Sequence, residues 1–123
     1  MSDNILIEEV AADPTTLVIN PLFTYRSFAQ GNVAQEWITL QGRLDPPEIK
    51  NIIIDLAAIP FFGSTVLEWM VHIWKRLKEK SGHLVLCNVS EVGLQILQAA
   101  RLNTVWPTFA NREEAQQWLA SQK

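Results

Sequence analysis

Apolar and polar residues are grouped along the chain into blocks that predict alternating strands and helices. Near the N-terminus, residues 4–10 and 16–22 are apolar and β-branched enough to form strands, and residues 11–14 separate them as a turn. A helix is expected next, because Asn32 is a typical N-cap residue with a glutamine three positions later and apolar residues at helical spacing behind it. The consecutive prolines at positions 46 and 47 end this helix.

The centre of the chain carries the strongest periodic signals. Residues 51–56 contain a run of isoleucines, and such a continuous β-branched run is typical of a central strand that is buried on both faces. The longest helical pattern covers residues 64–80. Gly82 is expected to end this helix, and the basic residues just before it suit the negative end of the helix dipole.

The C-terminal part repeats the alternation of strand and helix. Residues 83–87 predict an apolar strand, and Ser90 caps the helix after it. Residues 104–109 predict a short strand in which Pro107 favours a sheet edge. Asn111 caps a final helix. Because strands that alternate with helices form parallel sheets, we expect an α/β fold with a small mixed, largely parallel sheet, to which the N-terminal pair of strands adds an antiparallel edge.

The composition is that of an ordinary globular domain. The chain has 123 residues, of which 48% are hydrophobic and 19% charged, which excludes intrinsic disorder and predicts one domain over residues 1–123. A net charge of −3 is atypical of nucleic-acid binding. The N-terminus has no signal-peptide pattern, and no apolar stretch approaches the roughly 20 residues of a membrane span. These observations predict a cytoplasmic protein with no nucleic-acid partner and no membrane insertion.

Few residues are suited to catalysis, metal binding or cofactor binding. His72, on the polar side of the long helix, and His83, at the start of a strand, are expected at the surface. Cys87 lies in an apolar strand with no basic neighbour in sequence, so a buried, unreactive thiol is expected. One cysteine alone forms neither an internal disulfide nor a zinc site, and no phosphate-binding glycine motif is present. The sequence therefore predicts no enzyme, no metal and no cofactor.

The segment Phe-Phe-Gly-Ser-Thr-Val at residues 61–66 stands out because it follows the buried strand and opens the long helix. Loops at the C-terminal ends of parallel strands are where α/β folds place functional groups. Ser64 is expected to be the N-cap of the helix, and this structural role is one sufficient explanation for it. The other explanation is phosphorylation, because a phosphate there would lie at the positive end of the helix dipole and add about −1.5 to −2 charges that repel a docked partner.

The apolar surface of the long helix is wider than a core-facing stripe requires. An ordinary core-facing arc is formed by Leu67, Met70, Val71, Trp74 and Leu77. Val66, Trp69 and Ile73 extend this arc on one side and begin beside Ser64. Two interpretations remain open: neighbouring segments cover these extra residues, or they form a contact surface for another protein or a second copy, with Trp69 as its anchor.

Two long runs of residues carry a family resemblance. The first begins Asn-Ile-Ile-Ile-Asp-Leu-Ala-Ala-Ile-Pro-Phe-Phe-Gly-Ser-Thr-Val-Leu at residue 51 and ends Gly-His-Leu-Val-Leu-Cys-Asn at residues 82–88. The second is Leu-Gln-Ala-Ala-Arg-Leu-Asn-Thr-Val-Trp-Pro at residues 97–107, followed by residues 111–115. Together they resemble the STAS family, the anti-sigma-factor antagonists and related domains of sulfate transporters. The resemblance is strongest over residues 48–120.

The resemblance implies a mixed sheet covered by helices and a partner-switching mechanism. The family's bacterial antagonists bind an anti-sigma factor that is also a serine kinase of the histidine-kinase-like ATPase type; phosphorylation ejects the antagonist, and a phosphatase resets it. The accepting serine lies in an Asp-Ser-x-Gly pattern at the start of the long helix. By resemblance, Ser64 is the phosphoacceptor and Thr65 the second candidate. The expected partner-binding residues are Gly63, Ser64, Thr65, Val66, Trp69 and Ile73.

The chain departs from the family pattern at two positions, and this keeps a second hypothesis open. Gly63 stands where the family has Asp, which removes a negative charge beside the acceptor, and Val66 stands where the family has Gly. The second hypothesis is an accessory subunit or docking module of a membrane transport complex for lipids or anions, because such a module needs no phosphoacceptor. A nucleotide-binding or enzymatic role finds no supporting motif.

Overall fold

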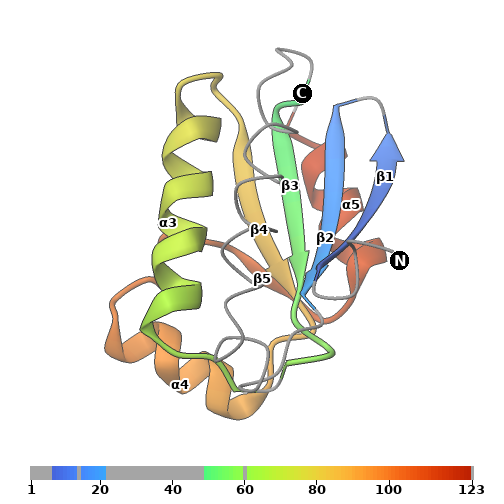
Figure 1. Cartoon of the computed structure of the whole chain (residues 1–123). Coiled ribbons are helices and arrows are strands. Elements are labelled where there is room, and N and C mark those ends of the chain that lie inside the picture. The colour runs from blue at the N-terminus through green and yellow to red at the C-terminus, as the bar shows by residue number, and fades with distance from the viewer. Residues whose placement is uncertain (1–6, 14, 22–48, 60, 123) are drawn as a thin grey trace, which may run out of the picture.

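Figure 1 shows the computed structural model, in which a five-stranded sheet carries helices on both faces. The structure describes residues 7–13, 15–21, 49–59 and 61–122. The helix predicted to begin at Asn32 lies outside the described residues, as does the start of the strand predicted over residues 4–10.

The strands lie side by side in the order in which they occur along the chain. They are β1 (Ile7–Asp13), β2 (Thr16–Pro21), β3 (Asn51–Asp55), β4 (His83–Cys87) and β5 (Thr108–Phe109). Strand β1 pairs antiparallel with β2, and every other neighbouring pair is parallel. This arrangement confirms the predicted α/β class and the largely parallel sheet with an antiparallel edge.

Strand β1 is longer at its C-terminal end than the sequence pattern predicts. The prediction of a turn over residues 11–14 is wrong for residues 11–13, which belong to the strand: Ala11 pairs with Leu17, and Asp13 pairs with Thr16. The register shifts between Ala11 and Asp13. Such an irregularity lets a strand continue pairing past a residue that does not fit the regular ladder, and the chain therefore reverses only after Asp13.

The helices cover the two faces of the sheet unequally, as Figure 1 shows. Helix α3 (Ser64–Lys78) covers one face, and α5 (Arg112–Ala120) lies on the other. Helix α4 (Glu91–Ala99) lies below α3 in the figure, at one end of the sheet, and its Leu97 packs in the same core as α3. Alternate side chains of β3 enter different cores: Ile52 and Ile54 pack in the cluster beneath α3, whereas Ile53 packs against α5. The isoleucine run is therefore buried from both sides, as predicted for a central strand.

Helix α3 ends in a left-handed turn, two residues before the predicted end. The N–H of Gly82 donates to the Leu77 carbonyl (2.8 Å) and the N–H of Ser81 to the Lys78 carbonyl (3.0 Å), while Ser81 itself has φ of 60°. This pattern is the Schellman motif. A positive φ is not the reason that position 82 requires glycine. Glycine is required because a Cβ there would lie 1.6 Å from the carbonyl oxygen of Lys50.

The last two helices begin as predicted, whereas the strand between them is shorter. Ser90 accepts a hydrogen bond from the N–H of Gly93 (2.9 Å), and Asn111 accepts one from the N–H of Glu114 (2.9 Å). Of the predicted strand over residues 104–109, only the last two residues pair with β4. Trp106 is instead fully buried in the core, with its ring centroid 6.2 Å from that of Trp74 in an edge-to-face contact. Burial of this large side chain takes precedence over strand pairing.

Candidate partner-binding site

The chain between β3 and α3 presents an exposed phenylalanine beside the start of the helix. Leu56, Ile59 and Phe62 point into the core and hold this segment in place. Phe61, between two of these anchors, is 71% exposed, and Gly63 is also exposed. A large apolar side chain that a folded protein leaves in water, next to a helix N-terminus, is suited to contact a partner.

Helix α3 starts with Ser64, and Gly63 takes the N-cap position that the sequence assigned to Ser64. The prediction of Ser64 as N-cap is therefore wrong by one residue. No side chain caps this end, and the first turn contains no acidic residue. The N–H of Leu67 donates to the carbonyl of Gly63 at 3.2 Å. The backbone N–H groups that precede it have no acceptor within the helix, which makes this end suited to an anion.

The buried face of α3 differs from the predicted one. Val66 and Ile73 are each 3% exposed and belong to the core, together with Met70 and Leu77. The expectation that Val66 and Ile73 lie on a partner-binding surface is thus corrected. Trp69 is half-buried and packs at the border of this core. The apolar arc of the helix was wide enough to pack in two orientations, and contact with the sheet selected the one that buries its Val66 edge.

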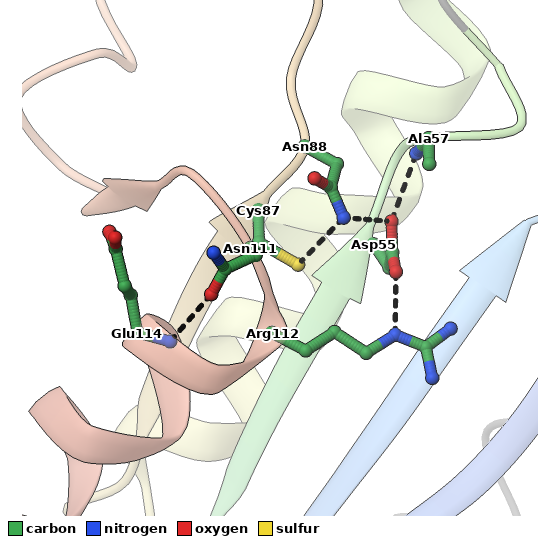
Figure 2. A network of polar contacts seen from close by, with 7 residues as sticks. All are labelled: Asp55, Ala57, Cys87, Asn88, Asn111, Arg112 and Glu114. Atoms are coloured by element: carbon green, nitrogen blue, oxygen red, sulfur yellow. Dashed lines mark hydrogen bonds and ion pairs between the residues drawn. The ribbon is translucent and has the colours of Figure 1, made fainter.

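A network of polar contacts at the C-terminal end of β3 was not predicted from the sequence (Figure 2). Oδ1 of Asp55 accepts hydrogen bonds from the N–H of Ala57 and from Nδ2 of Asn88, both at 3.0 Å. Oδ2 of Asp55 accepts from Nε of Arg112 at 2.5 Å in an ion pair. An acidic residue directly after a buried isoleucine run was the available signal.

Asp55 is ionised at neutral pH although it is only 4% exposed. Burial by itself raises the pKa of this carboxyl. The hydrogen bonds from Ala57, Arg112 and Asn88, together with the positive charge of Arg112, more than offset this effect, so the pKa of Asp55 lies below its ordinary value. The carboxylate is therefore a stable negative charge in the structure.

The remaining candidate residues are one cysteine and two histidines, and Cys87 adjoins the Asp55 network, because Nδ2 of Asn88 donates to its Sγ at 3.9 Å (Figure 2). Cys87 is buried, and burial raises the pKa of its thiol to about 12, in agreement with the predicted unreactive thiol. His72 is exposed as expected, whereas His83 is half-buried, with its ring centroid 5.4 Å from that of Trp118.

Within the described residues, no group of three His, Cys, Asp or Glu side chains is placed to hold a metal ion. Among the helices that the structure describes, none is long and apolar enough to span a membrane.

Comparison with known proteins identifies the family of this chain. The STAS domain family matches residues 7–115, so the chain belongs to the STAS domain family, as the resemblance implied. The comparison with curated protein sequences gave no match.

The solved structures that resemble the chain include anti-sigma-factor antagonists. An anti-sigma-factor antagonist (STAS) domain protein from Planctomyces limnophilus is 30% identical with a TM-score of 0.76, and the match covers 93% of this chain and 97% of that protein. The anti-sigma factor antagonist SpoIIAA in its unphosphorylated form is 17% identical with a TM-score of 0.77 and coverage of 94% and 96%. SpoIIAA of Bacillus in its phosphorylated form is 19% identical with a TM-score of 0.68 and coverage of 90% and 96%.

Proposed function

We propose that the protein is a cytoplasmic anti-sigma-factor antagonist that works by partner switching. It binds an anti-sigma factor that is a serine kinase of the histidine-kinase-like ATPase type, phosphorylation of Ser64 ends the complex, and a phosphatase restores it. The observation that carries this proposal is the start of α3, where Ser64 opens a helix whose N-terminus has no side-chain cap and no acidic residue in its first turn. Membership of the STAS family and the fold shared with SpoIIAA support it.

The chemistry of such a switch fits a helix N-terminus. Transfer of the γ-phosphoryl group of ATP to the Ser64 hydroxyl releases ADP and the hydroxyl proton, and it leaves about −1.5 to −2 charges at the first position of α3. The helix dipole and the backbone N–H groups of the first turn stabilise that charge by about 0.3–1 kcal/mol. The fold therefore tolerates the modification, while a partner surface that fits the neutral serine is repelled.

The proposed contact surface combines the start of α3 with the segment before it. Gly63, Ser64 and Thr65 would form its centre, with Trp69 on the following turn. Phe61 is added to the residues expected from the sequence, because its exposure gives it the geometry of an interface anchor. Val66 and Ile73 are left out, because both are buried in the core.

The test compares partner binding by the wild type, Ser64→Asp and Ser64→Ala. The wild type is purified from its host with bound proteins, an ATPase identified by mass spectrometry is produced separately, and affinities are measured by calorimetry. We expect Ser64→Asp to weaken binding at least about tenfold, or about 1.4 kcal/mol, and Phe61→Ala to weaken it without loss of thermal stability. Phosphopeptide mapping after addition of ATP should locate the phosphate on Ser64 and show none on Ser64→Ala.

The matched control is Ser81→Asp, which places the same charge at the opposite end of α3. Ser81 is exposed and has a positive φ that aspartate tolerates, so this variant should fold and bind as the wild type does. Equal affinity of the wild type and Ser64→Asp for the ATPase would contradict the switch. Retention of a transporter ATPase or permease by both forms would instead favour the accessory-subunit hypothesis.

A further inference from the structure

The Asp55 network joins three parts of the chain that are distant in sequence. Arg112, the first residue of α5, reaches across the end of β3 to the carboxylate, and Asn88 approaches it from the end of β4 (Figure 2). Asp55 and Arg112 are 57 positions apart. The third contact, from the N–H of Ala57, belongs to the segment that leads to α3. One buried charge therefore holds the start of that segment to α5 and to β4.

The arrangement is determined in detail by the need to satisfy a buried carboxylate. Each oxygen of Asp55 has at least one donor, and loss of a donor would leave a desolvated charge without full compensation. Asn88 has φ of 55°, a left-handed conformation that asparagine adopts more readily than most residues, and this conformation accompanies the contact of its amide with Asp55. The carboxylate is therefore satisfied by donors from three separate segments of the chain.

Arg112 is in a position that a helix by itself does not favour. A positive side chain at the first residue of a helix faces the positive end of the helix dipole. Its side chain is 34% exposed, so it is not needed to fill the core. The ion pair with Asp55 therefore explains an arginine at this position, whereas the helix dipole does not.

The segment between Asp55 and Ser64 is suited to transmit the effect of this contact. Ala57 is tied to the Asp55 side chain, and the Leu56 N–H donates to the Cys87 carbonyl at 3.0 Å. A turn follows in which the Ile59 N–H donates to the Leu56 carbonyl at 3.2 Å. Ile59 and Phe62 are then buried in the core directly before the start of α3. The described part of this segment is therefore fixed at both ends, by Asp55 at Ala57 and by the core at Ile59 and Phe62.

We propose that Asp55 and Arg112 are positioning residues that form a clamp, in which the ion pair holds residues 56–59 and 61–62 and thereby sets the backbone conformation of Gly63, Ser64 and Thr65. The clamp is a property of the free protein. Its consequence for partner binding rests on the function proposed above, because Ser64 is the residue presented to the kinase.

The first test measures amide hydrogen exchange in the free protein near neutral pH for the wild type, Arg112→Gln, Arg112→Lys and Arg101→Gln. Arg112→Gln places a neutral amide nitrogen at the chain position of the arginine Nε, and it removes the charge together with the outer part of the guanidinium group. We expect exchange over residues 57–66 to be about tenfold faster in Arg112→Gln and less affected in Arg112→Lys, which keeps the charge. Arg101 is exposed after α4, so Arg101→Gln is the matched control and should exchange as the wild type does.

Amides of β3 and β4 separate positioning from general destabilisation. Selective acceleration over residues 57–66, with slow exchange retained in these strands and partial rescue by lysine, supports the clamp. Acceleration confined to α5, equal acceleration over the whole chain, or no change would each overturn it, because the segment before Ser64 would then not depend on the ion pair.

A second test connects the clamp with the proposed switch. The rate of Ser64 phosphorylation by the purified partner ATPase is measured for the same variants, and Arg112→Gln should change it at least about threefold while Arg101→Gln does not. The two proposals fail in different ways. An unphosphorylated wild type with selective exchange in Arg112→Gln would overturn the switch and support the clamp, whereas normal phosphorylation of the wild type with unchanged exchange in Arg112→Gln would overturn only the clamp.

Discussion

At the scale of single residues, burial of the Asp55 carboxylate costs free energy of hydration, and it requires particular hydrogen-bond donors around it. A buried carboxylate loses its hydration, and the protein compensates with two neutral donors and one cationic donor. Because the pKa of Asp55 is lowered in the folded protein, its ionised form stabilises the fold above the ordinary pKa of aspartate. That contribution is lost as the pH falls through the lowered pKa of Asp55, when the folded protein also becomes protonated there.

Replacement of Asp55 by asparagine is expected to destabilise the protein by about 1–3 kcal/mol at pH 7, because one of the donors would then face an amide N–H instead of an oxygen. The difference in the free energy of unfolding between wild type and Asp55→Asn should stay constant above about pH 5. It should shrink as the pH falls below the ordinary value of 3.8. Urea denaturation followed by tryptophan fluorescence at a series of pH values measures this.

The control for this experiment is Glu113→Gln, which removes an exposed carboxylate from the first turn of α5. Its effect should be below about 1 kcal/mol, as is usual for an exposed charge at a helix N-terminus. If Asp55→Asn and Glu113→Gln change the stability equally at pH 7, the network has no special importance for the fold.

At the scale of elements, the two ends of α3 are built in opposite ways. Its C-terminal end is closed by the Schellman motif and by the close approach of Gly82 to Lys50. Its N-terminal end has neither a side-chain cap nor an acidic first turn. The stable end anchors the helix to the sheet, and the open end keeps its N–H groups available at the proposed partner site.

The two glycines beside α3 should respond differently to alanine. Gly82→Ala is expected to cost at least about 2 kcal/mol, because a Cβ there overlaps the backbone carbonyl of Lys50, and backbone cannot move aside as a flexible side chain can. Gly63→Ala should cost less, at most about 1 kcal/mol, because a Cβ there meets no atom within 4 Å and only the preference for glycine over alanine at an N-cap is lost. Thermal unfolding of both variants measures the contrast, and similar melting temperatures would show that Lys50 and Gly82 can separate at little cost.

The types of most described elements, and the starts of two helices, follow from short sequence signals. Ser90 and Asn111 cap their helices as predicted, because a cap depends on residues within one turn. The face of α3 was predicted incorrectly, because both edges of its apolar arc satisfy the helical period, and only the fit of Val66 and Ile73 against the sheet distinguishes them. Strand β5 was predicted too long, because the pattern around Trp106 does not tell strand pairing from burial in a core.

At the scale of the whole molecule, the sheet separates two cores of different size. The larger contains the buried side chains of α3 together with Trp106, and the smaller contains Cys87, Ala115 and Leu119 beneath α5. Asp55 lies at the end of the strand that contributes to both, next to Cys87 in the register of β3 and β4. The start of α5 is thus held at the C-terminal end of β3, where the chain leaves the sheet toward α3.

The thiol of Cys87 provides a measure of how firmly the smaller core is closed. Burial raises its pKa to about 12, so little thiolate is present at pH 8.5 and reagents have no access. We expect alkylation of the native protein to be at least about 100-fold slower than alkylation in urea, as it must wait for local or global opening. A Gln116→Cys variant, which adds an exposed thiol on α5, is the control. Labelling of Cys87 as fast as that of the added thiol would show that α5 opens readily.

The sequence by itself determined the class of fold, most described strands and helices and the capped helix starts, because these depend on interactions between residues close together in the chain. It also indicated the family, because the matching runs of residues are present in the sequence itself. Only the tertiary structure decided which face of α3 is buried and that Arg112 reaches Asp55. Both outcomes depend on how distant segments meet across the sheet, and a helical period or a lone aspartate at a strand end contains no information about its partner. The exposure of Phe61 and the contact between Asp55 and Arg112 are consequences of that long-range packing.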